Sequence, residues 1–179
     1  MSFTLDGYRA LLDAAAAGGY RVRGFLDGPP ADGDLLLRHD VDMSLSAAVE
    51  MAELEADRGV RATYFLMTQS SFYNLLGKPG QRTLARLREL GHVVGYHAVW
   101  PNATADPAFG FAPVLAWHTP EPHYMAEPVE GWTNVMDPAF TGDFAMTYRS
   151  DSNQHWRRGD PLDDLAAGRF PWLQLLIHP

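Results

Sequence analysis

Residues 35–42 read Leu-Leu-Leu-Arg-His-Asp-Val-Asp, and this stretch decides the fold of the chain. An apolar run that leads directly into charged residues is typical of a buried strand that ends in a loop. Buried ionised groups need a partner, a metal ion or a shifted pKa, so we expect one aspartate to bind a cation and the other to handle a proton. The alternative is that Asp40 or Asp42 caps the helix predicted to start near Ser44.

The bulk composition narrows the class of protein. The 179 residues suit a single domain, 1–179, with one sizeable core. A formal net charge of −8 and a sequence pI of about 5.2 argue against nucleic acid and anionic membranes as partners, because both are polyanions. The chain has no cysteine, so any metal ion must be held by His, Asp or Glu.

The beginning of the sequence bears on location. It lacks a basic segment followed by an apolar core, and no apolar run approaches the roughly 18 residues that a membrane span requires. We expect a cytoplasmic protein, with a secreted form whose signal has been removed as the alternative. The sequence leaves the oligomeric state open.

The first half of the chain alternates between strand and helix patterns. We expect helices over residues 4–17, 44–58 and 81–90, and strands over residues 20–25, 35–39, 61–67 and 93–97. Such alternation predicts parallel β/α units, whose sites form from side chains at the carboxyl ends of strands. The charged residues of 50–58 are expected to form a solvated helix face without a function.

Prolines break the second half into short pieces. We expect strands over residues 114–117, 144–148 and 172–177 and a helix over residues 161–167. Residues 101–141 are aromatic-rich, which favours substrate-binding loops over a disordered linker. The aromatic residues in question are expected in core or loop packing, with stacking on a sugar ring as the alternative: Trp100, Trp117, Tyr124, Trp132 and Trp156.

Ionisable residues end several predicted strands, which is the second informative feature. Catalytic zinc typically has three protein ligands from His and carboxylate groups and an open position for water. Asp42, His97 and His118 would complete such a set, and His178 ends the last strand. The alternative for each histidine is a hydrogen-bonded structural role, which we expect for His92 at the start of its strand.

Three motifs in order carry a family resemblance. They are Arg38-His-Asp-Val-Asp42, Ala62-Thr-Tyr-Phe-Leu-Met67 and Gly91-His-Val-Val-Gly-Tyr-His97. With them the chain resembles the polysaccharide deacetylase family, carbohydrate esterase family four, and in particular its branch with an HDVD motif. The resemblance implies an α/β fold, an irregular or incomplete (β/α) barrel of about seven strands.

The resemblance also implies residue roles. It makes Asp40 the general base, His178 the general acid and Asp151 the aspartate that tunes that histidine. Asp42 and His97 are implied metal ligands. Most of the family has a second ligand histidine four residues beyond the first, where this chain has a proline; His118, in Ala116-Trp-His-Thr-Pro120, resembles the Ser-x-His-x-Pro segment of the narrower branch. The family's Arg-x-Pro-Tyr motif is not evident.

The implied activity is metal-dependent removal of an N-acyl group from an amino sugar or related carbohydrate. Zinc is the expected metal, although an Asp-His-His set also accepts cobalt or nickel. A first alternative is a deacylase of a small nucleotide-linked sugar, and a small acylated amine is a further substrate class. A second alternative is a non-catalytic relative that binds a carbohydrate or a metal ion.

Overall fold

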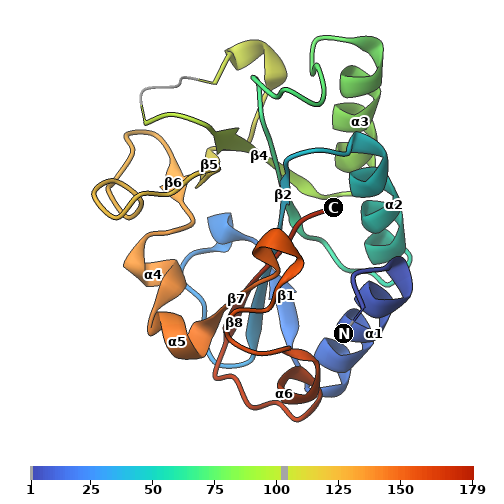
Figure 1. The fold of residues 1–179 in the computed structure, drawn as a ribbon, viewed down its shortest axis with the longest axis vertical. Helices are drawn as coiled ribbons and strands as arrows, with labels where there is room; N and C mark the ends of the chain where they lie inside the picture. Colours follow the sequence, from blue (N-terminus) through green and yellow to red (C-terminus); the bar gives the residue numbers. More distant parts are fainter. Residues whose placement is uncertain (1, 102–104) are drawn as a thin grey trace.

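A curled, parallel β-sheet organises the chain in this computed structural model, which describes residues 2–101 and 105–179 (Figure 1). The strands are β1 (Arg21–Arg23), β2 (Asp34–Val41), β3 (Thr63–Leu66), β4 (Val93–Ala98), β5 (Val114–Trp117), β6 (Thr133–Asn134), β7 (Tyr148–Ser150) and β8 (Leu173–Ile177). Their order is β6-β5-β4-β3-β2-β8-β7, and β1 pairs with β2 outside this path.

All pairings between these strands are parallel. Strands β6 and β7 stand at opposite ends of the order, and no pairing within the described residues joins them. The sheet is therefore an open half-barrel, which agrees with an incomplete α/β barrel. The expected strand count of about seven matches the seven strands of the main path.

The helices are α1 (Leu5–Ala17), α2 (Leu45–Ala56), α3 (Lys78–Glu89), α4 (Pro138–Thr141), α5 (Phe144–Thr147) and α6 (Leu162–Ala166). The three long helices, α1, α2 and α3, lie in a row along one side of the sheet (Figure 1). Side-chain oxygens cap two of them: Thr4 accepts the N–H of Gly7, and Ser44 accepts the N–H of Ala47. Ser44 therefore fills the capping role considered for Asp40 and Asp42.

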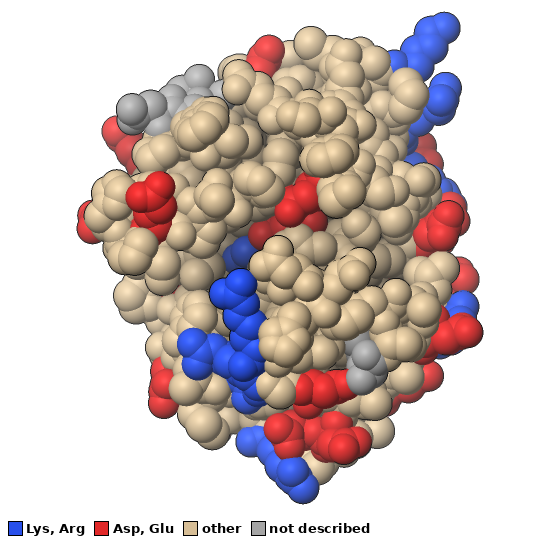
Figure 2. Space-filling model, in the orientation of Figure 1, with Lys and Arg blue, Asp and Glu red and all other residues tan. Residues whose placement is uncertain are grey.

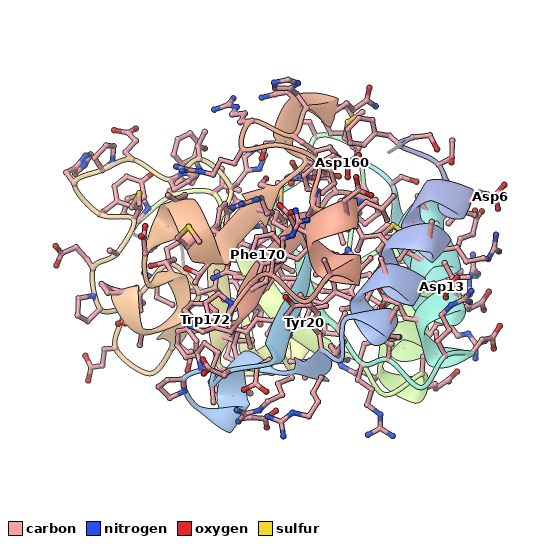
Figure 3. The ribbon with its side chains drawn as sticks, turned by 90° about the horizontal axis from the view of Figure 1, so that it is seen from below. Asp6, Asp13, Tyr20, Asp160, Phe170 and Trp172 are labelled. Atoms are coloured by element: carbon pink, nitrogen blue, oxygen red, sulfur yellow. The ribbon has the colours of Figure 1, made fainter. Side chains whose placement is uncertain are left out.

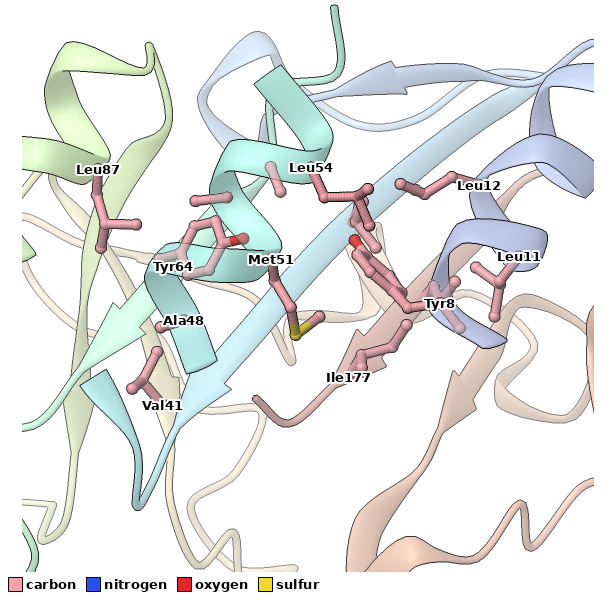
Figure 4. Packing of buried hydrophobic residues seen from close by; sticks show 14 of the residues in the cluster. Tyr8, Leu11, Leu12, Val41, Ala48, Met51, Leu54, Tyr64, Leu87 and Ile177 are labelled. Atoms are coloured by element: carbon pink, nitrogen blue, oxygen red, sulfur yellow. The ribbon is translucent and has the colours of Figure 1, made fainter. Parts of the chain in front are cut away.

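Alternation along β2 divides its side chains between two apolar clusters. Leu35, Leu37 and Val41 belong to the helix-side cluster, which Figure 4 shows between the sheet and α1 and α2. Leu36 belongs to the cluster on the opposite face, together with Phe65. Because successive strand side chains point to opposite faces, Arg38 and Asp40 share the face of Leu36, and His39 lies on the helix side.

One side chain ties the segment between α1 and β1 to the segment that precedes β8. The Tyr20 hydroxyl donates to the Phe170 carbonyl at 2.9 Å and accepts the Phe170 N–H at 2.8 Å. Figure 3, seen from below, labels both residues near the centre of the view, and it shows Asp6 and Asp13 of α1 on the outer surface. The polar face of α1 therefore points to solvent while its apolar face covers the sheet.

Most of the elements expected from the sequence are present, and one is wrong. Residues 144–148 were expected as a strand, but Phe144–Thr147 forms helix α5 and only Tyr148 begins strand β7. The Asp143 carboxylate accepts the N–H of Ala145 and starts this helix. Local capping therefore outweighs the β propensity of the aromatic residues.

The expectation of a solvated face over residues 50–58 is wrong at Glu55. This side chain is completely buried between α2 and the sheet. Tyr8 and Tyr64 donate hydrogen bonds to its carboxylate, and His39 Nε2 lies 2.6 Å from it. His39 Nδ1 lies 3.1 Å from the Ile177 carbonyl. Both His39 nitrogens therefore face oxygen atoms, and His39 and Glu55 form a buried pair between the sheet and α2.

None of the helices in the described residues combines the length and the apolar character needed to cross a bilayer.

Candidate metal centre

Three side chains meet at the carboxyl-end edge of the sheet. Asp42 follows β2, His97 lies in β4 and His118 follows β5. His97 Nε2 lies 3.1 Å from Asp42 Oδ1, and His118 Nδ1 lies 3.2 Å from the same oxygen. One ligand atom from each residue lies within 4.8 Å of the other two. The residues expected from the sequence therefore form a possible metal-binding triad.

The hydrogen bonds of His97 test whether a cation suits this triad. Nδ1 lies 3.1 Å from the Ala116 carbonyl and can donate to it, in which case the neutral form of the ring presents the Nε2 lone pair. That lone pair faces the carboxylate of Asp42. Two electron-rich atoms at this separation need a proton or a cation between them. A carbonyl bound to the outer ring nitrogen is also the usual support of a metal-ligating histidine, so the triad fits zinc.

Asp40 lies behind the triad as a buried carboxylate. Its Oδ2 accepts a hydrogen bond from Arg38 at 2.8 Å and lies 3.8 Å from His97 Nε2. Its Oδ1 is buried and has no hydrogen-bond partner in the described residues. Burial alone would raise the pKa of Asp40, but the charges of Arg38, His97 and His178 hold it below its usual value of 3.8. Asp40 is therefore an ionised carboxylate with one oxygen free for a ligand.

Arg38 is a site residue that the sequence did not single out. Its guanidinium is buried, with a side-chain exposure of 3%. Besides Asp40 it donates to the Gln174 side chain at 3.0 Å, and it lies over the Phe65 ring. A signal was available, because Arg38 precedes Asp40 by two residues and a strand places both on one face.

His178 and Asp151 form a second pair at the site. His178 Nδ1 lies 2.7 Å from Asp151 Oδ1, and the His178 backbone N–H also donates to that carboxylate. His178 Nε2 lies 3.9 Å from Asp42 Oδ2. Burial alone would lower the pKa of His178, but the Asp151 hydrogen bond and the charges of Asp40, Asp151 and Asp42 raise it above its usual value of 6.5. The ring is therefore predisposed to hold a proton on Nε2.

A cavity of about 670 Å³ opens beside these groups. Asp42, His118, Asp151 and His178 line it, whereas Asp40 and His97 lie buried behind its wall. Figure 2 shows acidic side chains in a hollow near the centre of this face of the molecule. The cavity gives a ligand access to the triad and to the His178 ring.

The expected substrate loops contribute little to this cavity. From residues 101–141 only His118 and Thr119 line it; residues 102–104 lie outside the described part of the chain. The other walls come from the N-terminal segment, residues 42 and 43, α2, residues 151–154 and residues 177–179. Among the aromatic candidates, Trp117 is buried in the core, Trp156 stacks on Phe3 and Trp132 packs on Tyr96. A smaller cavity of about 330 Å³ lies away from the triad.

The remaining histidines fall outside the site. His92 is buried; it accepts the Ala62 N–H through Nδ1, and its Nε2 donates to the Ala52 carbonyl. This confirms the structural role expected for it. His123 and His155 are exposed.

Comparison with models of known protein families, with curated proteins and with solved structures finds no match for this chain.

Proposed function

We propose that this chain is a divalent-metal-dependent hydrolase that removes an N-acyl group from an amino sugar or a related acylated amine. The observation that carries the proposal is the placement of the triad, the buried Asp40 and the His178–Asp151 pair at one end of the sheet. A module that only binds a ligand has no need for a base and an acid on either side of a metal site. The motif resemblance to polysaccharide deacetylases supports the same activity.

Asp42, His97 and His118 would hold the metal ion. When bound, a zinc ion supplies a water of lowered pKa and polarises the acyl carbonyl, and cobalt or nickel would suit the same ligands. The Ala116 carbonyl fixes the ring of His97 and keeps its Nε2 available. Most of the resembled family has a ligand histidine where this chain has Pro101. A histidine at that position is not needed here, because His118 would complete the set.

The protein groups divide the proton transfers of amide hydrolysis between them. Asp40, held ionised by Arg38, accepts a proton from the attacking water as its oxygen bonds to the acyl carbon. His178, held by Asp151, donates a proton to the amide nitrogen as the carbon–nitrogen bond breaks. The products are a carboxylic acid and a free amine. Transfer of the proton from Asp40 to His178 through solvent then restores both groups to their starting states.

Asp40→Asn tests the proposal. The amide preserves the shape of the side chain and an acceptor for Arg38 but removes the base, so acetate release from N-acetylated amines should fall by about 10²–10⁴-fold. Zinc content, measured by elemental analysis, should remain that of the wild type. Asp32→Asn, an exposed aspartate outside the site, serves as the control. Undiminished acetate release by Asp40→Asn, or none from the zinc-loaded wild type, would contradict the proposal.

A further inference from the structure

The cavity beside the triad contains one carboxylate that the proposed chemistry does not use. Glu50 lies on α2, lines the cavity and is exposed. Within the described residues it makes no ion pair and no hydrogen bond, whereas Asp42 faces His97 and Asp151 holds His178. Apart from the candidate ligands and the His178–Asp151 pair, Glu50 is the only charged side chain among the described residues that line this cavity.

Lysine and arginine side chains are missing from the described part of the same wall: no Lys or Arg is among the described residues that line the cavity. A phosphate group is usually held by guanidinium or ammonium groups or by free N–H groups at a helix start. At the start of α2, the Ala47 N–H is already bound by the Ser44 hydroxyl at 3.1 Å. The cavity thus lacks the guanidinium and ammonium side chains that usually hold a phosphorylated substrate.

Apolar side chains form much of the remaining wall. Phe3, Leu5, Met43 and Met51 come from the N-terminal segment and from α2 and its approach, and Ile177 comes from the end of β8. Met43 and Phe3 are exposed by 60% and 44%. Exposed apolar side chains that line a cavity are suited to cover the apolar part of a ligand.

We propose, resting on the hydrolase function above, that the substrate is an acylated amine with an alkyl stem and a second, positively charged amino group. The stem lies against Phe3, Met43 and Met51, and the ammonium group binds the Glu50 carboxylate. The same wall offers no Lys or Arg to a phosphorylated or nucleotide-linked substrate, so such a substrate should bind more weakly. The net charge of −8 acts in the same direction, because it attracts cations and repels phosphates before contact.

Glu50 variants of the full-length, zinc-loaded protein test this inference. The probes are monoacetylated 1,4-diaminobutane, N-acetylglucosamine and N-acetylglucosamine 1-phosphate, with Kd measured by calorimetry and KM and kcat measured from acetate release. We expect the diamine derivative to bind at least tenfold more tightly than the sugar phosphate. Glu50→Gln should raise its Kd and KM about tenfold with little change in kcat, because a charge-assisted hydrogen bond is lost. Glu50→Lys should reverse the order of diamine and phosphate.

Glu53→Gln is the matched control, since Glu53 lies on the same helix, pairs with Arg86 and does not line the cavity. Its constants should equal those of the wild type. A sugar phosphate that binds as tightly as the diamine derivative would overturn the inference, as would equal binding by wild type and Glu50→Gln. If acetate is released fastest from the sugar phosphate, the inference fails while the hydrolase function stands. If calorimetry shows the tighter binding of the diamine derivative but no probe releases acetate, the binding inference stands and the proposed hydrolase function is rejected.

Discussion

Arg38 and Asp40 form a buried ion pair directly beneath the triad. Their side chains are 3% and 4% exposed and are joined at 2.8 Å. A buried pair of this kind contributes little net stability, but loss of one partner is costly because it leaves the other charge without compensation. Arg38 therefore matters for the site because it keeps a carboxylate ionised in an apolar setting.

Arg38→Met should lower the free energy of unfolding by about 3–5 kcal/mol, because it leaves Asp40 buried without its cation. The double variant Arg38→Met/Asp40→Asn should recover part of that loss, since it removes the uncompensated charge. Denaturant unfolding of the metal-free proteins measures both values. If the double variant loses more free energy of unfolding than the two single variants lose together, the ion pair is not the source of the effect.

At this scale the sequence predicts only part of the site. Alternation along one strand is enough to place Asp40 and Asp42 on one face, and the ends of parallel strands are enough to bring His97 to them. Glu55 could not be predicted, because its burial depends on Tyr8, Tyr64 and His39, which come from three other elements. On a helix with charged neighbours it has the pattern of a solvent-facing residue.

Strand β4 can approach its neighbours only because it contains Gly95. A Cβ atom at this position would lie 2.7 Å from the Phe65 ring and 2.8 Å from the Val114 carbonyl. The glycine in the motif that ends at His97 is therefore explained by the close approach of β3 and β5, which sets the position of His97 relative to Asp42 and His118.

Gly95→Ala should reduce the free energy of unfolding by about 1–3 kcal/mol, because an added methyl group in a packed core forces its neighbours to shift. Gly24→Ala is the control: its Cβ would meet nothing closer than 3.5 Å, so its stability should stay near that of the wild type. Chemical unfolding of both variants checks the difference. Equal stability of the two would show that β4 is not tightly packed against Phe65.

Helix α2 is held to the sheet by the buried Glu55 as well as by apolar packing. Burial alone would raise the pKa of Glu55, but the charge of His39 and hydrogen bonds from His39 and Tyr8 lower it below its usual value of 4.5. A carboxylate with a lowered pKa contributes stability that is present above its unfolded pKa and is lost as the pH falls through its folded pKa.

Glu55→Gln should therefore lower the free energy of unfolding by about 3 kcal/mol at neutral pH. The difference from the wild type should stay constant above about pH 4.5, the ordinary value, and shrink as the pH falls further. Unfolding curves from pH 3 to 7, about the range in which the carboxylate titrates, give the profile. Glu53→Gln, which breaks an exposed pair with Arg86, should cost less than about 1 kcal/mol. A Glu55→Gln effect independent of pH would contradict the ion pair with His39.

A helix or strand can be predicted from the sequence when local residues determine it, and cannot when contacts with distant residues do. The first-half strands and helices have apolar patterns and glycine stops of their own, so their positions agree with expectation. In the second half, Asp143 starts a helix where aromatic residues favoured a strand, and β6 and α4 were not expected. Short elements of this kind are set by caps and by contacts with the sheet rather than by periodicity.

The molecule as a whole joins two apolar clusters through one sheet. The helix-side cluster contains Leu37 and Tyr64, and the cluster on the other face contains Leu36 and Phe65, which are their neighbours in sequence. Because β2 and β3 contribute side chains to both clusters, neither cluster can unfold while the other stays folded.

We therefore expect one cooperative unfolding transition. Trp117 belongs to the cluster that contains Leu36, and Trp156 packs against the helix-side cluster. Tryptophan fluorescence of Trp117→Phe and Trp156→Phe and far-ultraviolet circular dichroism should give coinciding midpoints within each variant. Separate midpoints for the two probes would show that the two faces unfold independently.

The central claim is that Asp42, His97 and His118 hold one divalent metal ion, and metal content tests it most directly. The account predicts about one equivalent of zinc, cobalt or nickel in the purified or reconstituted wild type. The metal should be lost in Asp42→Ala and in His118→Ala but kept in His123→Ala, an exposed histidine outside the triad. A wild type that binds no metal after reconstitution, or one that keeps its metal in both triad variants, would contradict the account.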